Sequence, residues 1–171
     1  MTLLARGSLV NVYTSLDAYL TQTLVAAPPN GPGLAVNLPG VRRFVPPIDD
    51  PWVVPHYDFL GLQQQYRHLA NATQYVTERQ GYLQLNIYQR ARIWTQRYLT
   101  AAARDQVVNV FPDGKIITIY DYSNLDNPEP DVVGYFHVDG LKEHVQDSGL
   151  RSGVIQHIVQ VSTHYFEYFT R

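Results

Sequence analysis

Apolar residues recur at three- and four-residue steps in two stretches of the sequence, which is the spacing of amphipathic helices. The first predicted helix takes Ser8 as its N-cap and must end by Ala27, because two prolines follow. The second spans roughly Ile93 to Val110 and stops at a Pro-Asp-Gly turn. The apolar positions of the first helix are Leu9, Val12, Tyr13, Leu16, Leu20 and Leu24.

Alternation of apolar and polar residues predicts strands that have one buried and one exposed face. It begins clearly at Gly81, after which Leu83, Leu85 and Ile87 alternate with polar residues. The last segment, Val154 to Phe169, alternates over sixteen residues. An average strand has only about 5–6 residues. This segment is therefore expected either to bend at a bulge or to extend past its own domain and pair with another chain.

Shorter runs complete the expected fold, a single domain over residues 1–171. The polar stretch from Gln63 to Gln80 predicts a protruding loop or hairpin. Helix, strands, helix and strands follow one another in an order typical of an α+β fold. We expect a largely antiparallel or mixed sheet with two main helices packed on one face. The remaining strands are predicted at Trp52–Phe59, Lys115–Tyr120 and Asp131–Val138.

Residues 28–55 form a proline-rich arm that holds eight of the eleven prolines. Proline excludes a regular helix and confines any strand to the edge of a sheet. The arm nevertheless carries apolar residues, which a solvated linker does not need. We therefore expect an extended arm that packs either on its own domain or on a neighbouring subunit, with the neighbour favoured.

Composition adds one observation about the surface. Only 16% of the residues are charged, and thirteen tyrosines stand against six phenylalanines. Tyrosine is enriched at protein–protein contacts because it joins a large apolar face to a hydroxyl that tolerates water. It is also enriched in strands, and both explanations stay open.

Charge and cysteine content exclude several classes of protein. A net charge of −2 and a pI near 6.3 give no electrostatic basis for a nucleic-acid-binding domain. The absence of cysteine excludes disulfide scaffolds, thiolate zinc sites and thiol catalysis. No apolar run approaches the roughly 18–20 residues of a membrane span, and the N-terminus lacks the pattern of a signal peptide. We expect a soluble, intracellular protein without membrane contacts.

Motifs that would carry catalysis or bind a cofactor are missing. No two histidines have the i, i+4 spacing of a zinc protease, and His157 and His164 fall on opposite faces of one strand. No serine lies in a Gly-x-Ser-x-Gly turn, and no glycine-rich phosphate loop occurs. We therefore expect no enzyme activity, no metal and no cofactor. The histidines are His56, His68, His137, His144, His157 and His164.

Arginines cluster around the second predicted helix. Arg97 and Arg104 share one of its faces because seven residues are close to two helical turns. A solvated helix face is the favoured interpretation. The alternative is a row of cations that contacts DNA or a partner's carboxylates, and a ring would repeat that row in every subunit.

Four segments in order resemble the tail terminator, or tail completion, family of long-tailed bacteriophages. They are an opening helix around Leu16–Leu20, the run Phe44–Pro47 leading into Trp52–Val54, the strand Gly81–Ile87, and a helix carrying Ala101–Ala103. The resemblance runs through most of the chain. Order and spacing carry it, since no single segment is specific.

The resemblance implies a structural virion protein at the head-proximal end of the tail, assembled in the host cytoplasm. Family members form a homohexameric ring that ends polymerisation of the tail tube and joins it to the connector or stopper protein of the head. Genomic DNA passes through the lumen without sequence-specific binding. The candidate subunit-interface residues are Phe44, Pro46, Pro47, Trp52, Tyr165, Phe166, Tyr168 and Phe169. The candidate lumen or partner contacts are Arg90, Arg92, Arg97 and Arg104.

Two other functions remain open at the level of sequence. The nearer one is another neck or tail-tube component of the same virion. The more distant one is a small-molecule-binding or catalytic domain, with Tyr, His and Asp side chains lining a pocket inside a curved sheet. His157, on the apolar face of the last strand, is the one residue that favours such a pocket.

Overall fold

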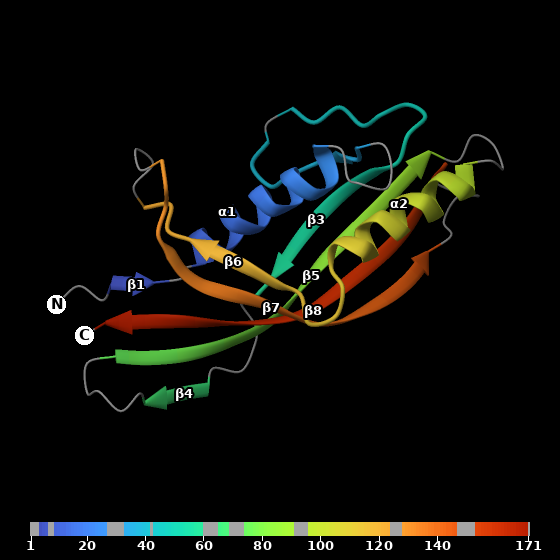
Figure 1. Ribbon diagram of the computed structural model, residues 1–171. Coiled ribbons are helices and arrows are strands. Elements are labelled where there is room, and N and C mark those ends of the chain that lie inside the picture. The colour runs from blue at the N-terminus through green and yellow to red at the C-terminus, as the bar shows by residue number, and fades with distance from the viewer. Residues whose placement is uncertain are drawn as a thin grey trace.

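The computed structural model describes residues 4–6, 9–26, 33–41, 43–59, 65–68, 74–90, 96–123, 128–146 and 153–170 (Figure 1). Its helices are α1 (Leu9–Leu20), a π-helical turn (Thr21–Val25) and α2 (Gln96–Val110). The strands are β1 (Leu4–Arg6), β2 (Ala35–Val36), β3 (Trp52–Asp58), β4 (Gln65–His68), β5 (Gln74–Arg90), β6 (Ile116–Tyr120), β7 (Val132–Gln146) and β8 (Val154–Thr170).

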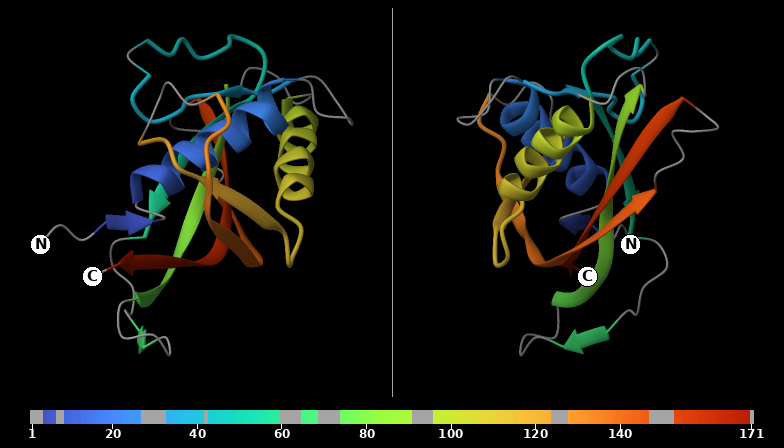
Figure 2. Two further views of the ribbon diagram at one scale, coloured as in Figure 1. Left: turned by 60° about the vertical axis from the view of Figure 1, so that its left-hand side comes forward. Right: turned by 90° about the vertical axis from the view of Figure 1, so that its right-hand side faces the viewer.

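The strands form one sheet in the order β2-β3-β5-β8-β7-β6, with β1 added to β8 and β4 added to β5. Every neighbouring pair in that order is antiparallel except β2 and β3, which are parallel. The sheet curls, and both helices lie on its concave side (Figure 2). The predicted α+β fold with two helices on one face of a largely antiparallel sheet is confirmed.

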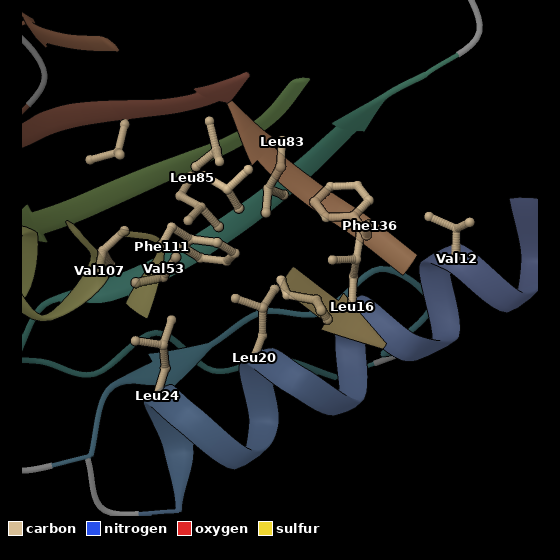
Figure 3. Packing of buried hydrophobic residues seen from close by; sticks show 14 of the residues in the cluster. Val12, Leu16, Leu20, Leu24, Val53, Leu83, Leu85, Val107, Phe111 and Phe136 are labelled. Atoms are coloured by element: carbon tan, nitrogen blue, oxygen red, sulfur yellow. The ribbon is translucent and has the colours of Figure 1, made fainter. Parts of the chain in front are cut away.

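The core lies between α1 and the concave face of the sheet (Figure 3). Val12, Leu16, Leu20 and Leu24 are all buried, as the four-residue spacing predicts. They point toward aromatic and aliphatic side chains of the strands and of the segment after α2. The main strand-side and α2-side members of this cluster are Val53, Phe59, Leu83, Leu85, Ile87, Val107, Phe111, Ile119, Phe136, Val159, Val161 and Tyr165.

The π turn explains how Leu24 stays in this stripe. Steps of four residues overshoot the 3.6 residues of an α turn, so a stripe built on them drifts around the helix. A π turn is wider and reverses the drift at the last step, between Leu20 and Leu24. The hydroxyl of Thr21 donates to the carbonyl of Asp17 at 2.8 Å, a bond that often accompanies a bend in a helix.

Two strands, β5 and β7, are several residues longer than the sequence predicts. β5 starts at Gln74 rather than at Gly81, and its first part forms a hairpin with β4, so the hairpin alternative for Gln63–Gln80 is the correct one where the chain is described. Figure 1 shows this end of the sheet projecting past both helices. No helix covers either face there, so no alternation of apolar and polar residues is required.

β7 continues from Val138 to Gln146 beyond its predicted end. Its register on β8 shifts between Val138 and Gly140, which marks a bulge. An Asp139-Gly140 pair usually indicates a turn. Here the Asp139-Gly140 pair forms the bulge, which holds one extra residue, and β7 continues beyond the bulge to Gln146.

The described part of the arm is attached to the domain by hydrogen bonds near its start and near its end. The N–H of Leu34 donates to the carbonyl of Leu24 at 2.7 Å. Ala35 and Val36 form β2 at the edge of the sheet, as expected for a proline-rich segment. The buried side chain of Gln89 donates from Nε2 to the carbonyl of Asp49 at 2.8 Å. Residues 43–47, between these attachments, belong to no helix or strand. Residues 27–32 lie outside the described part of the chain.

Candidate functional site

Where β3, β5 and the first part of β8 adjoin, the convex face of the sheet carries a cluster of uncharged polar side chains. Gln84, Asn86 and Tyr88 share one face of β5, and Gln156 on β8 is the register partner of Tyr88. Gln84 Nε2 and Gln156 Nε2 both donate to Asn86 Oδ1, at 2.8 and 3.2 Å. Trp52 stacks on Tyr88 with ring centroids 5.7 Å apart. Amide groups that are already bonded to one another need less water than charges do, so this face suits contact with another protein.

An apolar patch adjoins this face where β6 meets β7. We call it the β6–β7 patch and define it as Ile116, Tyr120, Val132 and Tyr135. Tyr120 pairs with Val132, and Tyr135 pairs with Thr118, so all four side chains lie on the convex face. Their exposed fractions are 37% to 52%. Neighbouring exposed apolar residues on a sheet face that no helix covers are typical of a protein contact.

A groove of about 230 Å³ lies beside the patch, between α1 and the outer edge of β6. At the C-terminal end of β6, side chains of α1 accept hydrogen bonds from the backbone of this edge. Ser15 Oγ accepts the backbone N–H of Tyr120 at 3.0 Å, and Asn11 Oδ1 accepts that of Tyr122 at 3.0 Å. Farther along, α1 and β6 diverge, and the groove opens. Its lining includes Ala18, Tyr19, Gln22, Lys115, Ile116 and Thr118.

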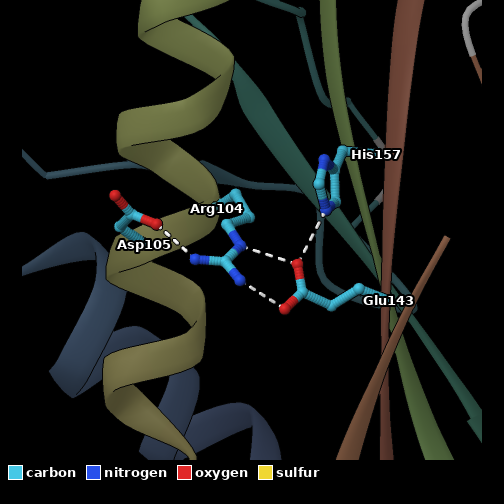
Figure 4. A network of polar contacts seen from close by, with 4 residues as sticks. All are labelled: Arg104, Asp105, Glu143 and His157. Carbon is cyan, nitrogen blue, oxygen red and sulfur yellow. Dashed lines mark hydrogen bonds and ion pairs between the residues drawn. The ribbon is translucent and has the colours of Figure 1, made fainter. Parts of the chain in front are cut away.

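A polar network joins α2 to the far end of the sheet (Figure 4). Arg104 Nε donates to Glu143 Oε2 at 2.6 Å, and its Nη2 donates to Glu143 Oε1. His157 Nε2 lies 3.1 Å from the same carboxylate, and Asp105 accepts from Arg104 Nη1 at 2.5 Å. The guanidinium of Arg104 lowers the pKa of Glu143 by stabilising its charged form. The network holds α2 against β7 and β8.

The bulge in β7 makes this network possible. Without the extra residue at Asp139, Glu143 would fall on the convex face, because side chains alternate along a strand. With it, Glu143 pairs with Val159 and faces α2. His157 therefore contacts a structural ion pair, and it does not line the α1–β6 groove.

The two histidines with opposite predicted orientations do lie on opposite faces. His164 is on the convex face, where its ring stacks on His137 at 4.7 Å, nearly parallel. Asp139 contacts His164 Nδ1 at 2.7 and 2.9 Å. Among the described residues, no group of three or more histidine, aspartate or glutamate side chains converges as a metal site does.

The predicted interface residues have different positions. Tyr165 and Trp52 are buried in the chain itself, so they are not available to a neighbour in this fold. Phe166 is half-buried on the convex face, and its ring meets that of His164 at 5.7 Å. Tyr168 and Phe169 belong to β8, but their side chains lie outside the described part. The arm residues Phe44, Pro46 and Pro47 are all half-buried.

The overhanging end of the last strand is paired within the chain. β8 extends past the helices, but β5 pairs with it from Arg90 to Gln74, and β1 pairs with its last residues. The expectation that these backbone groups await another chain is therefore wrong. Sequence alone does not indicate that Gln74–Gln80 and Leu4–Arg6 supply the partners.

Of the four arginines, Arg104 is engaged by Glu143 and Asp105. Its positive charge is thus largely balanced within the chain. Arg90 is half-buried at the end of β5, and the side chains of Arg92 and Arg97 lie outside the described part. Only Arg90 and Arg104 have described side chains, so a row of four arginines stays a prediction.

Sequence reasoning missed the β6–β7 patch. The signal was present, because the strand Ile116–Tyr120 is apolar at nearly every position, whereas a strand with one exposed face alternates. Val132 and Val133 repeat the pattern on the next strand. A two-sided apolar strand is either sandwiched within the domain or half-covered by a partner, and only the structure separates the two.

No protein-family model matches this sequence, and no curated protein matches it. Within the described residues, no helix has both the length and the apolar character needed to cross a membrane.

Proposed function

We propose that this chain is a structural subunit that assembles into a homo-oligomeric ring, most simply a hexamer, and that the ring terminates a bacteriophage tail tube. The observation that carries the self-assembly is the β6–β7 patch. Large apolar side chains stand there next to one another on a face that the domain leaves uncovered. Covering them with a second protein removes apolar surface from water, which is the main driving force of association.

The arm supports a ring rather than a two-fold dimer. The arm runs on the opposite side of α1 from β6 (Figure 1). Its side chains of Val45 and Ile48 are exposed, Val45 by 84%. Two apolar surfaces in different places can meet head to tail, and such a contact closes into a ring when the rotation permits. Each contact needs roughly 1,600 Å² of total buried area to reach the size of a standard stable interface.

The place in the virion is supported by the resemblance of the sequence to tail terminators. The resembling segments form the opening helix, the arm, β3, β5 and α2 in the structure. In this role the ring contacts the tail tube on one side and the head connector or stopper protein on the other, and DNA passes through its lumen. The role requires no catalytic group.

Mass photometry over a concentration series tests the assembly. We expect the intact chain to form one closed species, and the double variant Val132→Ser/Tyr135→Ser to remain smaller at concentrations at which the intact chain assembles. Val10→Ser is the matched control, because Val10 is 68% exposed on α1, outside the patch. A monomer at every concentration would overturn the ring.

The tail-specific part needs a second measurement. The protein is added to a tail-tube protein during polymerisation, and tube lengths are measured by negative-stain electron microscopy. We expect shorter tubes that carry a ring at one end, and the patch variant should lose the effect. A ring that neither binds tubes nor limits their length would indicate another component of the neck.

A further inference from the structure

The outer edge of β6 has backbone groups without a strand partner among the described residues. In an antiparallel ladder, alternate residues direct their N–H and C=O groups to the same side. Lys115 accepts the N–H of Val138, on β7, at 2.9 Å, so the odd-numbered residues of β6 face β7. Ile116, Thr118 and Tyr120 therefore face away from it. Ser15 satisfies Tyr120, which leaves Ile116 and Thr118 beside the groove.

The groove has the dimensions of a backbone-docking site rather than of a ligand pocket. Its volume of about 230 Å³ is below the roughly 300–1,000 Å³ of sites for drug-sized molecules. An open strand edge beside a shallow groove suits an added strand, in which main-chain hydrogen bonds give affinity and alternate side chains give register. An unpaired edge is also a site where uncontrolled aggregation begins, unless something covers it.

The arm of a second copy has the features that such a strand needs. Residues 43–47 belong to no helix or strand, and the two prolines favour an extended backbone at Val45 and Pro46, the residues that precede them. If Val45 faces the edge, so do Arg43 and Pro47, while Pro46 points away. Arg43 and Val45 retain their N–H groups, and Pro47 offers only its carbonyl, as an acceptor for the N–H of the β6 residue opposite it. Within one chain α1 lies between the arm and β6 (Figures 1 and 2). The arm therefore reaches this edge only in a neighbour.

Charge selects the direction of the added strand. In the antiparallel direction, Arg43 lies near the end of β6 at Tyr120, where the exposed Asp131 accepts the N–H of Asp121 through its carbonyl. In the parallel direction, Arg43 would lie beside Lys115. An antiparallel match of Val45 to Thr118 also puts the side chain of Val45 on the convex face, where it extends the β6–β7 patch.

We infer that residues 43–47 of one copy add as an antiparallel strand to the β6 edge of the next copy, with Val45 opposite Thr118. This contact rests on the proposed ring and specifies how its subunits join. It uses the free edge and the apolar patch of one subunit together with the most exposed apolar segment of the other. Repetition of the contact around the ring leaves neither surface open.

Disulfide cross-linking tests the register, and the natural chain has no cysteine to interfere. Copies carrying Val45→Cys are mixed with copies carrying Thr118→Cys under mild oxidation. Opposite residues that exchange both hydrogen bonds lie about 5.5 Å apart between Cα atoms, a distance that a disulfide spans. We expect cross-linked dimers to form about tenfold faster than with Val45→Cys and His144→Cys, because adjacency raises the effective thiol concentration.

His144 is a suitable control because it is exposed on β7, beyond the part that β6 covers. Rings that cross-link through His144→Cys instead, or through neither cysteine, would overturn this contact and leave the proposed ring intact. Monomers at every concentration would overturn both. The inference is supported if Val45→Cys copies cross-link with Thr118→Cys copies and do not cross-link with His144→Cys copies.

A backbone variant gives an independent readout. Thr118→Pro removes an N–H that faces the open edge, and the odd-numbered residues keep their bonds to β7. Thr118→Val is the matched control because it keeps the N–H. We expect at least about a tenfold weaker association for the proline variant, the loss of roughly 1.4 kcal/mol, with assembly of the valine variant unchanged. Thermal unfolding of the monomeric fraction verifies that both variants fold, and equal assembly of the two would contradict the docking.

Discussion

At the scale of single residues, the contact between Tyr57 and Asp17 joins β3 to α1. The phenol of Tyr57 donates to the Asp17 carboxylate, and Tyr13 stacks on Tyr57 with ring centroids 5.2 Å apart. Burial raises the pKa of Asp17, and the hydrogen bond from Tyr57 opposes that rise. Burial and the neighbouring carboxylate both raise the pKa of Tyr57. A half-buried carboxylate is thus held in place by one neutral donor.

Removing that donor should change how stability depends on pH. Burial holds the pKa of Asp17 in the folded chain above the ordinary value of an aspartate, so the folded state binds the proton more tightly than the unfolded state. Its contribution to stability is largest below the unfolded pKa and is lost as pH rises through the folded pKa. We expect Tyr57→Phe to raise the pKa of Asp17 further and to steepen this loss.

Urea unfolding from about pH 4 to 7, with NMR titration of the Asp17 carboxyl group, measures the effect. We expect Tyr57→Phe to cost about 1–3 kcal/mol at neutral pH, since it leaves a charged acceptor without its donor. Tyr13→Phe is the control, because it keeps the stacking and the Tyr57 hydrogen bond. An unchanged Asp17 titration in Tyr57→Phe would show that the contact does not control this carboxylate.

Gly81 is required by close packing rather than by its backbone angles. A Cβ atom at Gly81 would overlap the ring of Phe59 and the carbonyl of Asp58. Gly134 is also buried in a strand, but its added Cβ would meet Ile119 and Phe166 at 3.6 Å, an ordinary contact. We expect Gly81→Ala to lower the free energy of unfolding by about 1–3 kcal/mol and Gly134→Ala by clearly less. Chemical denaturation of both variants checks this, and equal costs would contradict it.

At the scale of elements, one side of α1 packs in the core and another side bonds to the edge of β6. One side supplies the apolar stripe of the core, and another closes part of the β6 edge through Asn11 and Ser15. Both polar side chains are buried, where an unpaired donor is costly. Tyr19 adds a link to α2 by donating from its hydroxyl to the carbonyl of Val110 at 2.7 Å. The position of α1 is therefore set by directional bonds as well as by burial.

Ser15→Ala should open that end of the β6 edge. The N–H of Tyr120 loses its acceptor, at a cost of about 1–3 kcal/mol. We expect faster hydrogen exchange of the Tyr120 amide than in the native chain, with little change for amides of β5. Thr14→Ala is the control, because its hydroxyl donates within the helix to Val10 at 2.8 Å. Equal protection of Tyr120 in both variants would mean that the serine does not hold this edge.

At the scale of the whole molecule, the proposed contacts are mostly uncharged. Neither the β6–β7 patch nor the amides of the convex face carry formal charge, and Arg104 and Glu143 neutralise one another inside the subunit. The placement of Arg43 near the end of β6 in the inferred contact orients the added strand more than it strengthens it. Association should therefore depend on apolar burial and backbone bonds.

Salt separates this mode of assembly from an electrostatic one. We expect sodium chloride between about 0.05 and 0.5 M to leave the association constant nearly unchanged, although the Debye length falls severalfold. Sodium sulfate at equal ionic strength should strengthen association, because it favours apolar burial. Mass photometry in both salts measures the effect. Dissociation in sodium chloride would identify ion pairs as the main contact.

Truncation of the arm cannot separate loss of assembly from loss of stability. Removing residues 28–39, the obvious way to shorten the arm, would also remove Leu34, which is buried in the core, and β2. Loss of assembly in such a variant would report on stability. Substitution at Val45 changes the exposed segment and leaves the attachment through Asp49 and Gln89 in place.

Local pattern was sufficient for much of the fold. The spacing of Val12, Leu16, Leu20 and Leu24 determined which side of α1 is buried, and the alternation after Gly81 determined the buried side of β5. The fold class followed from the order of elements. These features are readable because one-sided burial leaves a period in the sequence, and the period is local.

Tertiary structure decided everything that depends on which segments meet. The bulge at Asp139 moves Glu143 to the helix side, so that it joins Arg104 and His157. Tyr165 was predicted at an interface and is buried in the core. The end of β8 pairs with β1 and with the first part of β5, which lie far from it in the sequence. A register, a bulge or a sheet neighbour is selected by long-range pairing and loop closure, and neither leaves a period in the sequence.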